Sequence, residues 1–186
     1  MKRIRLFTIV FALFLFSCNS KISVEKYAEI QKKGNEISGQ TQSVLLSNVG
    51  QAIQKVGPVF AVEFCNLQAS PIVDSLNEAN NCSISRISAK NRNPKNILKT
   101  SSDKILWAIF EEGALKDTVI YESKKFIYYK PIKTALPACL KCHGQPGTDI
   151  DSSTVGKLKS LYPADLATGY GLNDFRGLWK IEFSVD

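Results

Sequence analysis

The sequence contains very little histidine and methionine. Its 186 residues include one histidine, His143, and one methionine, Met1. A single chain therefore cannot form a site that needs two histidines, and a four-ligand zinc site would take most of its ligands from cysteine. Long apolar runs are also missing. The longest, residues 6–16, has eleven residues, whereas a transmembrane helix takes about 20.

Residues 1–17 have the pattern of a secretory signal peptide. A basic start, MKRIR, precedes the apolar run, and SCNS follows it. The sequence LFSC at 15–18 resembles a bacterial lipobox, so we predict a lipid on Cys18 and a polar tether over 18–24. An ordinary signal peptide that contains a cysteine is the alternative, because Phe16 replaces the small residue that the box favours. The predicted location is the cell envelope, with a lipid anchor, facing the periplasm or the cell exterior.

The basic excess is modest once the signal is set aside. The formal net charge is +7, and Lys2, Arg3 and Arg5 lie in the segment that we expect to be removed. Export also argues against binding of nucleic acid. We therefore expect no nucleic-acid partner, and contact with a membrane through the lipid.

Helical periodicity dominates the first part of the chain. Apolar residues recur every three or four positions from about 24 to 56 and predict a long N-terminal helix, which the Gly-Pro pair at 57–58 would end. Two glycines in its first half leave open whether this helix is continuous. A second helix is predicted from 59 to 79, with a break or kink at Pro71.

The later chain is rich in β-branched and aromatic residues. The predicted elements are strands at 82–89, 117–123, 125–133 and 177–185, a capped helix at 101–113, and a loop at 137–147 followed by a polar, Gly-rich excursion to about 175. Helices followed by a mostly antiparallel sheet indicate an α+β fold, formed as a single domain over 25–186.

The segment PACLKCHGQPG, residues 137–147, places the only histidine directly after a Cys-x-x-Cys pair. This triplet is the attachment signature of c-type haem. Two thiols separated by two residues can form thioethers with the two vinyl groups of one porphyrin, and the next residue can donate an imidazole nitrogen to the iron. The predicted cofactor is one covalent haem c, held by Cys139, Cys142 and His143.

Other interpretations of these residues remain open. A thioredoxin-like redox pair normally begins a helix after a strand, and a loop between prolines and glycines does not match that setting. A zinc site would need Cys65 or Cys82 as a further ligand. A structural disulfide between Cys139 and Cys142 is the third alternative.

The sixth ligand of such an iron cannot be a second histidine, and Met1 would be lost with the signal. Cys65, Cys82, a lysine, a tyrosine or water remain. For an exported protein the plain interpretation is a disulfide between Cys65 and Cys82. The alternative interpretation is that the thiolate of Cys65 or Cys82 binds the iron.

Six sequence blocks, in a fixed order, resemble the PAS-like c-type haem domains, a family long catalogued as a domain of unknown function. Its members occur alone in the periplasm and as sensor domains of bacterial signalling proteins. The blocks are FCNLQASPI (64–72), RISAKNRNPKN (86–96), YYKPI (128–132), CLKCHG (139–144), YPADLATGY (162–170) and DFRG (174–177).

The resemblance implies a PAS-like antiparallel sheet with flanking helices and a long N-terminal helix. It also implies an iron held by a histidine and a cysteine, and it places the cysteine at Cys65, with His143 opposite. Because arginine pairs well with carboxylates, Arg92 and then Arg86 are the candidates for the haem propionates, with Arg176 a weaker one.

Three functions are compatible with this site. The first is a redox or small-gas sensor in which reduction or a gas displaces Cys65, and which signals through a partner protein. The second is a low-potential periplasmic electron carrier with a redox partner. The third, an enzyme of peroxide or sulfur chemistry, is the least favoured because no second histidine is present as a proton shuttle. Whether the long helix forms a homodimer is open.

Overall fold

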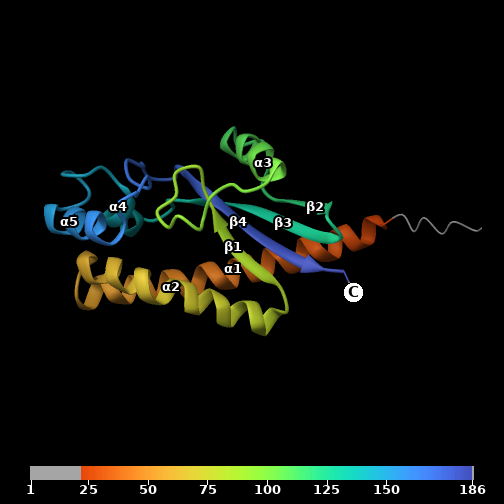
Figure 1. Ribbon diagram of the computed structural model, residues 1–186, viewed down its shortest axis with the longest axis horizontal. Coiled ribbons are helices and arrows are strands. Elements are labelled where there is room, and N and C mark those ends of the chain that lie inside the picture. Colours follow the sequence, from red (N-terminus) through yellow and green to blue (C-terminus); the bar gives the residue numbers. More distant parts are fainter. Residues whose placement is uncertain (1–21, 186) are drawn as a thin grey trace, which may run out of the picture.

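The computed structural model describes residues 22–185, so the predicted signal peptide and Cys18 lie outside the described residues. This part of the chain forms five helices and four strands (Figure 1). In order they are α1 (Val24–Lys55), α2 (Pro58–Asn80), β1 (Ser83–Ile87), α3 (Ser101–Glu111), β2 (Thr118–Glu122), β3 (Lys125–Lys133), α4 (Pro137–His143), α5 (Ser152–Leu161) and β4 (Phe175–Ser184).

The four strands form one antiparallel sheet in the order β1-β4-β3-β2. The predicted hairpin is β2–β3, and its turn falls on Ser123 and Lys124, one residue earlier than expected. Both have positive φ, 52° and 60°, which is the backbone twist that a two-residue hairpin turn needs. The α+β fold class predicted from the sequence is confirmed.

The long N-terminal helix is also confirmed, and α1 is continuous over 32 residues. It lies along one face of the sheet (Figure 1). Gly34 explains how it can lie so close, because a Cβ atom there would stand 2.3 Å from Cγ of Tyr128 on β3. The helix ends at Lys55, just before the expected Gly-Pro pair, and Gly57, with a φ of 114°, turns the chain into α2.

Helix α2 continues through Pro71 without an interruption in its assigned range. Its length decides one open question. Cys65 lies within this helix and Cys82 lies beyond its end at Asn80, so about 22 Å of helix separates the two cysteines at 1.5 Å per residue. A disulfide requires Cα atoms within about 7 Å. The structure thus excludes a Cys65–Cys82 disulfide within one chain, and both thiols are free.

Alternating residues of the sheet supply two apolar layers. Helices α1 and α2 cover the face that carries Tyr128, Trp179 and Ile181, whereas α3 covers the face that carries Tyr129 and Leu178. The large aromatic residues of these elements are buried: Tyr128 and Tyr129 are 0% exposed, Trp179 2% and Trp107 8%. Val185 lies past the end of β4 and is exposed.

A buried polar cluster attaches α3 to the sheet. The Asp103 carboxylate accepts hydrogen bonds from the Tyr129 hydroxyl (2.8 Å) and the Thr100 N–H (3.0 Å), and the Lys180 ammonium lies 3.0 Å away. Asp103 is fully buried. Burial alone would raise the pKa of this carboxyl, but the hydrogen bonds and the Lys180 charge outweigh burial and lower it.

Two local predictions were wrong. The segment with the two cysteines and the histidine is a short helix, α4, and not a loop, because Pro137 occupies its first turn, where a missing N–H costs nothing. The polar excursion that follows contains α5. Its start is fixed by Asp151, which accepts a hydrogen bond from the N–H of Thr154 at 2.8 Å.

Among the helices of residues 22–185, none has both the length and the apolar character required to cross a bilayer. Helices α4 and α5 gather at one end of the sheet (Figure 1). At this end of the sheet β1 and β3 finish and β4 begins. Side chains from these three strands therefore lie close together there.

We predict that Asp103→Asn destabilises the fold by roughly 3 kcal/mol, because it removes the nearer carboxylate of the buried Lys180 ammonium and leaves only Glu182, 3.5 Å away. Urea unfolding of the wild type and the variant at neutral pH measures this difference. The matched control is Asp74→Asn on the exposed face of α2, which should change stability by less than about 0.5 kcal/mol.

The same pair gives a pH test. The pKa of Asp103 in the folded protein lies below its unfolded value, so its contribution is fully present above the unfolded pKa and is lost as the pH falls through the folded pKa. The stability gap between wild type and Asp103→Asn should stay level from about pH 7 to 5 and narrow below about pH 4. A gap that is independent of pH would contradict this account.

Candidate functional site

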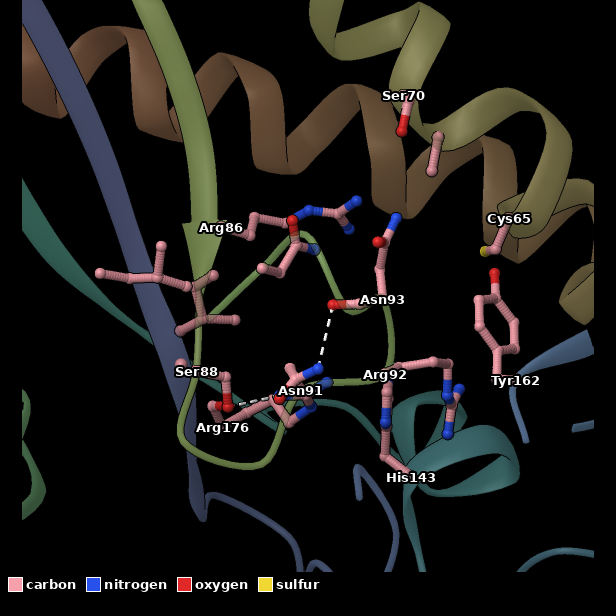
Figure 2. A pocket seen from close by; sticks show the side chains of 15 residues that line it. Cys65, Ser70, Arg86, Ser88, Asn91, Arg92, Asn93, His143, Tyr162 and Arg176 are labelled. Carbon is pink, nitrogen blue, oxygen red and sulfur yellow. Dashed lines mark hydrogen bonds between the residues drawn. The ribbon is translucent and has the colours of Figure 1, made fainter. Parts of the chain in front are cut away.

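Two adjoining lobes of one cavity open between the helices and this end of the sheet. The polar lobe has a volume of about 190 Å³ and the apolar lobe about 280 Å³. Figure 2 shows the polar lobe, with α2 above it and α4 below. The residues that line both lobes are Cys65, Arg86, Arg92, Ile132, His143, Tyr162 and Arg176.

Helix α4 presents its two cysteines to the apolar lobe. Cys139 and Cys142 are three residues apart on a helix and therefore share one side of it. Both line the apolar lobe and both are free thiols, so they do not form the disulfide that the sequence left open. Burial raises the pKa of Cys142 to about 11, which is opposite to the lowered pKa of a reactive redox cysteine.

His143, the last residue of α4, lines both lobes, and the backbone fixes its ring. Its Nδ1 lies 2.7 Å from the carbonyl oxygen of Ala167. A carbonyl oxygen can only accept, so Nδ1 carries the proton and Nε2 keeps its lone pair. Burial, together with the charges of Arg92 and Arg176, lowers the pKa of His143 well below its usual value. The ring is therefore neutral at physiological pH, as a metal-binding imidazole must be.

Arg92 holds this helix end in position. Its Nε donates to Asp165 at 3.0 Å, and its Nη2 donates to the carbonyl oxygens of Cys142 at 2.6 Å and Ala167 at 3.3 Å. The side chains of Arg92 and Asp165 are 13% and 10% exposed. One guanidinium thus joins the end of α4 to the segment whose carbonyl orients His143.

Arg86 and Arg176 are differently placed. Neither lies in an ion pair with an acidic residue in the described part of the chain. The Arg176 Nη1 donates to Ser88 and to the Lys90 carbonyl, but its buried Nε has no hydrogen-bond partner. Burial lowers the pKa of both arginines. The cavity wall therefore carries two cations without acidic partners, which favours an anionic ligand.

Cys65 lies on α2 and lines both lobes, across the cavity from α4 (Figure 2). Ala69, one turn later on the same helix, is buried and lines the polar lobe. Burial raises the pKa of the Cys65 thiol, and the nearby charges of Arg86 and Arg92 act in the opposite direction. Cys82 lines neither lobe.

Gly144, directly after the histidine, has no room for a side chain. A Cβ atom there would lie 2.5 Å from Cβ of Asp149 and 2.7 Å from the Leu140 carbonyl oxygen. The contact with backbone cannot relax by a rotamer change. Close packing at Gly144 brings the chain back past α4, where the Tyr170 N–H donates to the His143 carbonyl at 3.0 Å.

The residues present fit a haem of the c type. Two thiols line one apolar lobe, a neutral imidazole with a free Nε2 lies beside them, a further thiol lies across the cavity, and two cations without acidic partners are available for two carboxylates. In residues 22–185 no group of three or more His, Cys, Asp or Glu side chains is arranged to hold a metal ion by itself, so a zinc site at these cysteines has no complete ligand set here.

Comparison with known proteins places this α+β fold in a family. A model of the Tll0287-like family matches residues 19–184, and the chain belongs to that family. The structure is similar to the crystal structure of the cyanobacterial heme-protein Tll0287, with a TM-score of 0.63 and 17% sequence identity, over 89% of this chain and 98% of that chain. No curated protein matches the chain.

The structure adds residues that the sequence did not single out. Asp165, Ala167 and Tyr162 all belong to the block 162–170, which carried the family resemblance without an assigned role. Asp165 acts through its carboxylate, which binds Arg92, and Ala167 acts through its backbone carbonyl, which binds His143. A carbonyl is common to every residue, so no residue type could have marked Ala167.

We predict that Arg92→Gln destabilises the protein by about 3–5 kcal/mol, because it leaves the largely buried Asp165 carboxylate without its cation and removes one hydrogen bond from each of the Cys142 and Ala167 carbonyl oxygens. Urea unfolding of the haem-free protein measures this. The control is Lys157→Gln, which removes a partly exposed ion pair with Glu63 and should cost less than about 1 kcal/mol. Equal losses in the two variants would contradict the proposed role of Arg92.

Proposed function

We propose that this protein binds one haem c covalently and uses it as a redox or small-gas sensor module. Cys139 and Cys142 would form the thioethers, and His143 and Cys65 would be the axial iron ligands. The observation that carries the proposal is the fixed His143 ring. Its Nδ1 is bonded to the Ala167 carbonyl at 2.7 Å, and Nε2 is left available in a cavity that all three cysteines line.

The charges of the cavity support the same cofactor. Haem brings two propionates, and Arg86 and Arg176 are the two cavity arginines without acidic partners. Arg92, which the sequence favoured for this role, uses its Nε and Nη2 to bind Asp165 and two carbonyls. We therefore assign the propionates to Arg86 and Arg176, with Arg92 contributing its charge and the position of α4.

The bound haem would supply an iron that changes between ferric and ferrous states. A thiolate ligand favours ferric iron, so Cys65 is the ligand whose hold weakens on reduction. Departure of Cys65 would leave His143 in place, because its orientation depends on a backbone hydrogen bond on the opposite side. The site would then have two states, one with Cys65 bound and one with Cys65 released, while His143 stays bound in both. A sensor needs such a two-state element.

An electron carrier is the second candidate, and one feature favours it. Leu46 on α1 and Leu136 before α4 line the apolar lobe and are 39% and 47% exposed. A haem in this lobe would have an apolar edge close to the surface, where a redox partner could approach. In that case Cys65 should remain bound in both oxidation states.

The proposed location and partners rest on the N-terminal pattern. We propose a lipid on Cys18 and a position in the cell envelope, with the haem domain outside the cytoplasm, where c-type haem is attached. A sensor in this place would act on a signalling protein, and a carrier on a redox protein.

We predict that haem stays on the wild-type protein after acid–acetone extraction and adds its mass to the peptide that contains residues 137–147. The double variant Cys139→Ser/Cys142→Ser should release all of its haem, because a histidine and a thiolate alone hold it reversibly. Mass spectrometry of the digested protein measures both. Complete extraction of haem from the wild type would contradict covalent attachment.

We predict that Cys65→Ala abolishes the thiolate features of the oxidised absorption spectrum. The matched control is Cys82→Ala, which removes the other free thiol, one that lines neither lobe, and should leave the spectrum unchanged. Carbon monoxide should bind the reduced wild type if Cys65 departs, which supports the sensor. A reduced wild type that excludes carbon monoxide supports the carrier, and an unchanged Cys65→Ala spectrum contradicts the ligand assignment.

A further inference from the structure

Tyr162 lines the cavity together with Cys65, and backbone hydrogen bonds fix its position. It follows the end of α5, where its N–H donates to the Leu158 carbonyl at 2.8 Å and its own carbonyl accepts from the Asp165 N–H at 3.0 Å. The Arg92 guanidinium lies 5.9 Å from the centre of its ring. The ring is half-buried and lines both lobes, so its position is set by the same contacts that fix α4.

The hydroxyl of Tyr162 points toward the sulfur of Cys65 (Figure 2). Both side chains line both lobes of the cavity. A phenol carries a proton that it can donate to an acceptor such as sulfur.

We propose that the Tyr162 hydroxyl donates a hydrogen bond to the Cys65 sulfur when Cys65 binds iron, and so sets how strongly the thiolate holds the ferric state. The inference rests on the proposed function, because it needs Cys65 as an iron ligand. A donor to a coordinated sulfur withdraws electron density from it, and such hydrogen bonds tune the potential of the metal. Tyr162 is a positioning and tuning residue and does not touch the iron.

This hydrogen bond would have a specific effect in the sensor. Arg86 and Arg92 line the same two lobes as Cys65, and their positive charges attract an anionic sulfur. A neutral donor weakens the sulfur–iron bond without removing it. Tyr162 would thus keep Cys65 close to the point of release, so that a change in the iron is enough to free it.

The test uses haem-loaded Tyr162→Phe, which keeps the ring under Arg92 and removes only the hydroxyl. We expect a more negative reduction potential than in the wild type, a shifted sulfur-to-iron charge-transfer band, and slower carbon monoxide binding to the reduced protein. The iron–sulfur vibration in resonance Raman spectra should shift between H₂O and D₂O in the wild type and should not shift in Tyr162→Phe.

The control is Tyr170→Phe, which removes another buried tyrosine hydroxyl near His143 from a side chain that lines neither lobe. It should retain the solvent-isotope shift of the iron–sulfur vibration. An isotope shift that persists in Tyr162→Phe, with its potential unchanged, overturns this inference while Cys65 remains the ligand. Absence of any band that Cys65→Ala removes overturns the ligand assignment itself, and the two failures are therefore distinguishable.

Discussion

The geometry of the candidate site depends on one guanidinium group. Arg92 joins Asp165, the carbonyl of Cys142 and the carbonyl of Ala167, and that last carbonyl also accepts the His143 Nδ1 proton. Because these groups come from separate segments of the chain, a single buried cation sets the distance between them. Its position over the Tyr162 ring extends the same constraint to the side of the cavity where Cys65 lies.

The charges of the cavity are arranged around an expected anion. One of three cavity arginines is neutralised by a carboxylate, and two are not. Partly buried cations without acidic partners reduce the stability of the empty fold, so a dianionic ligand would recover that energy on binding. Burial lowers the pKa of His143 and raises the pKa of Cys65, and the arginine charges add to the first shift and oppose the second. Burial and the arginines together thus keep the proposed imidazole ligand neutral.

Much of the fold was predictable, because periodicity and turn residues are local signals. The long helix to Gly57, the helix at 101–113 and the hairpin followed from them. The short helix that contains Cys139 and the start of α5 at Asp151 were not predicted. These helices have seven and ten residues, which is too short for a helical pattern of apolar residues to be recognised. The residues that the sequence indicated for one haem site line the same cavity: Cys139, Cys142, His143, Cys65 and the arginines. The division of roles between Arg92 and Arg86 depends on tertiary hydrogen bonds, which spacing alone cannot reveal.

The central claim is that His143 and Cys65 hold the same iron from opposite sides of the cavity. X-ray absorption at the iron edge of the oxidised, haem-loaded protein tests it most directly, because sulfur scatters differently from nitrogen and oxygen. The account predicts one sulfur in the first coordination shell of the wild type, and none in Cys65→Ala. A first shell of nitrogen and oxygen atoms alone in the wild type would contradict it.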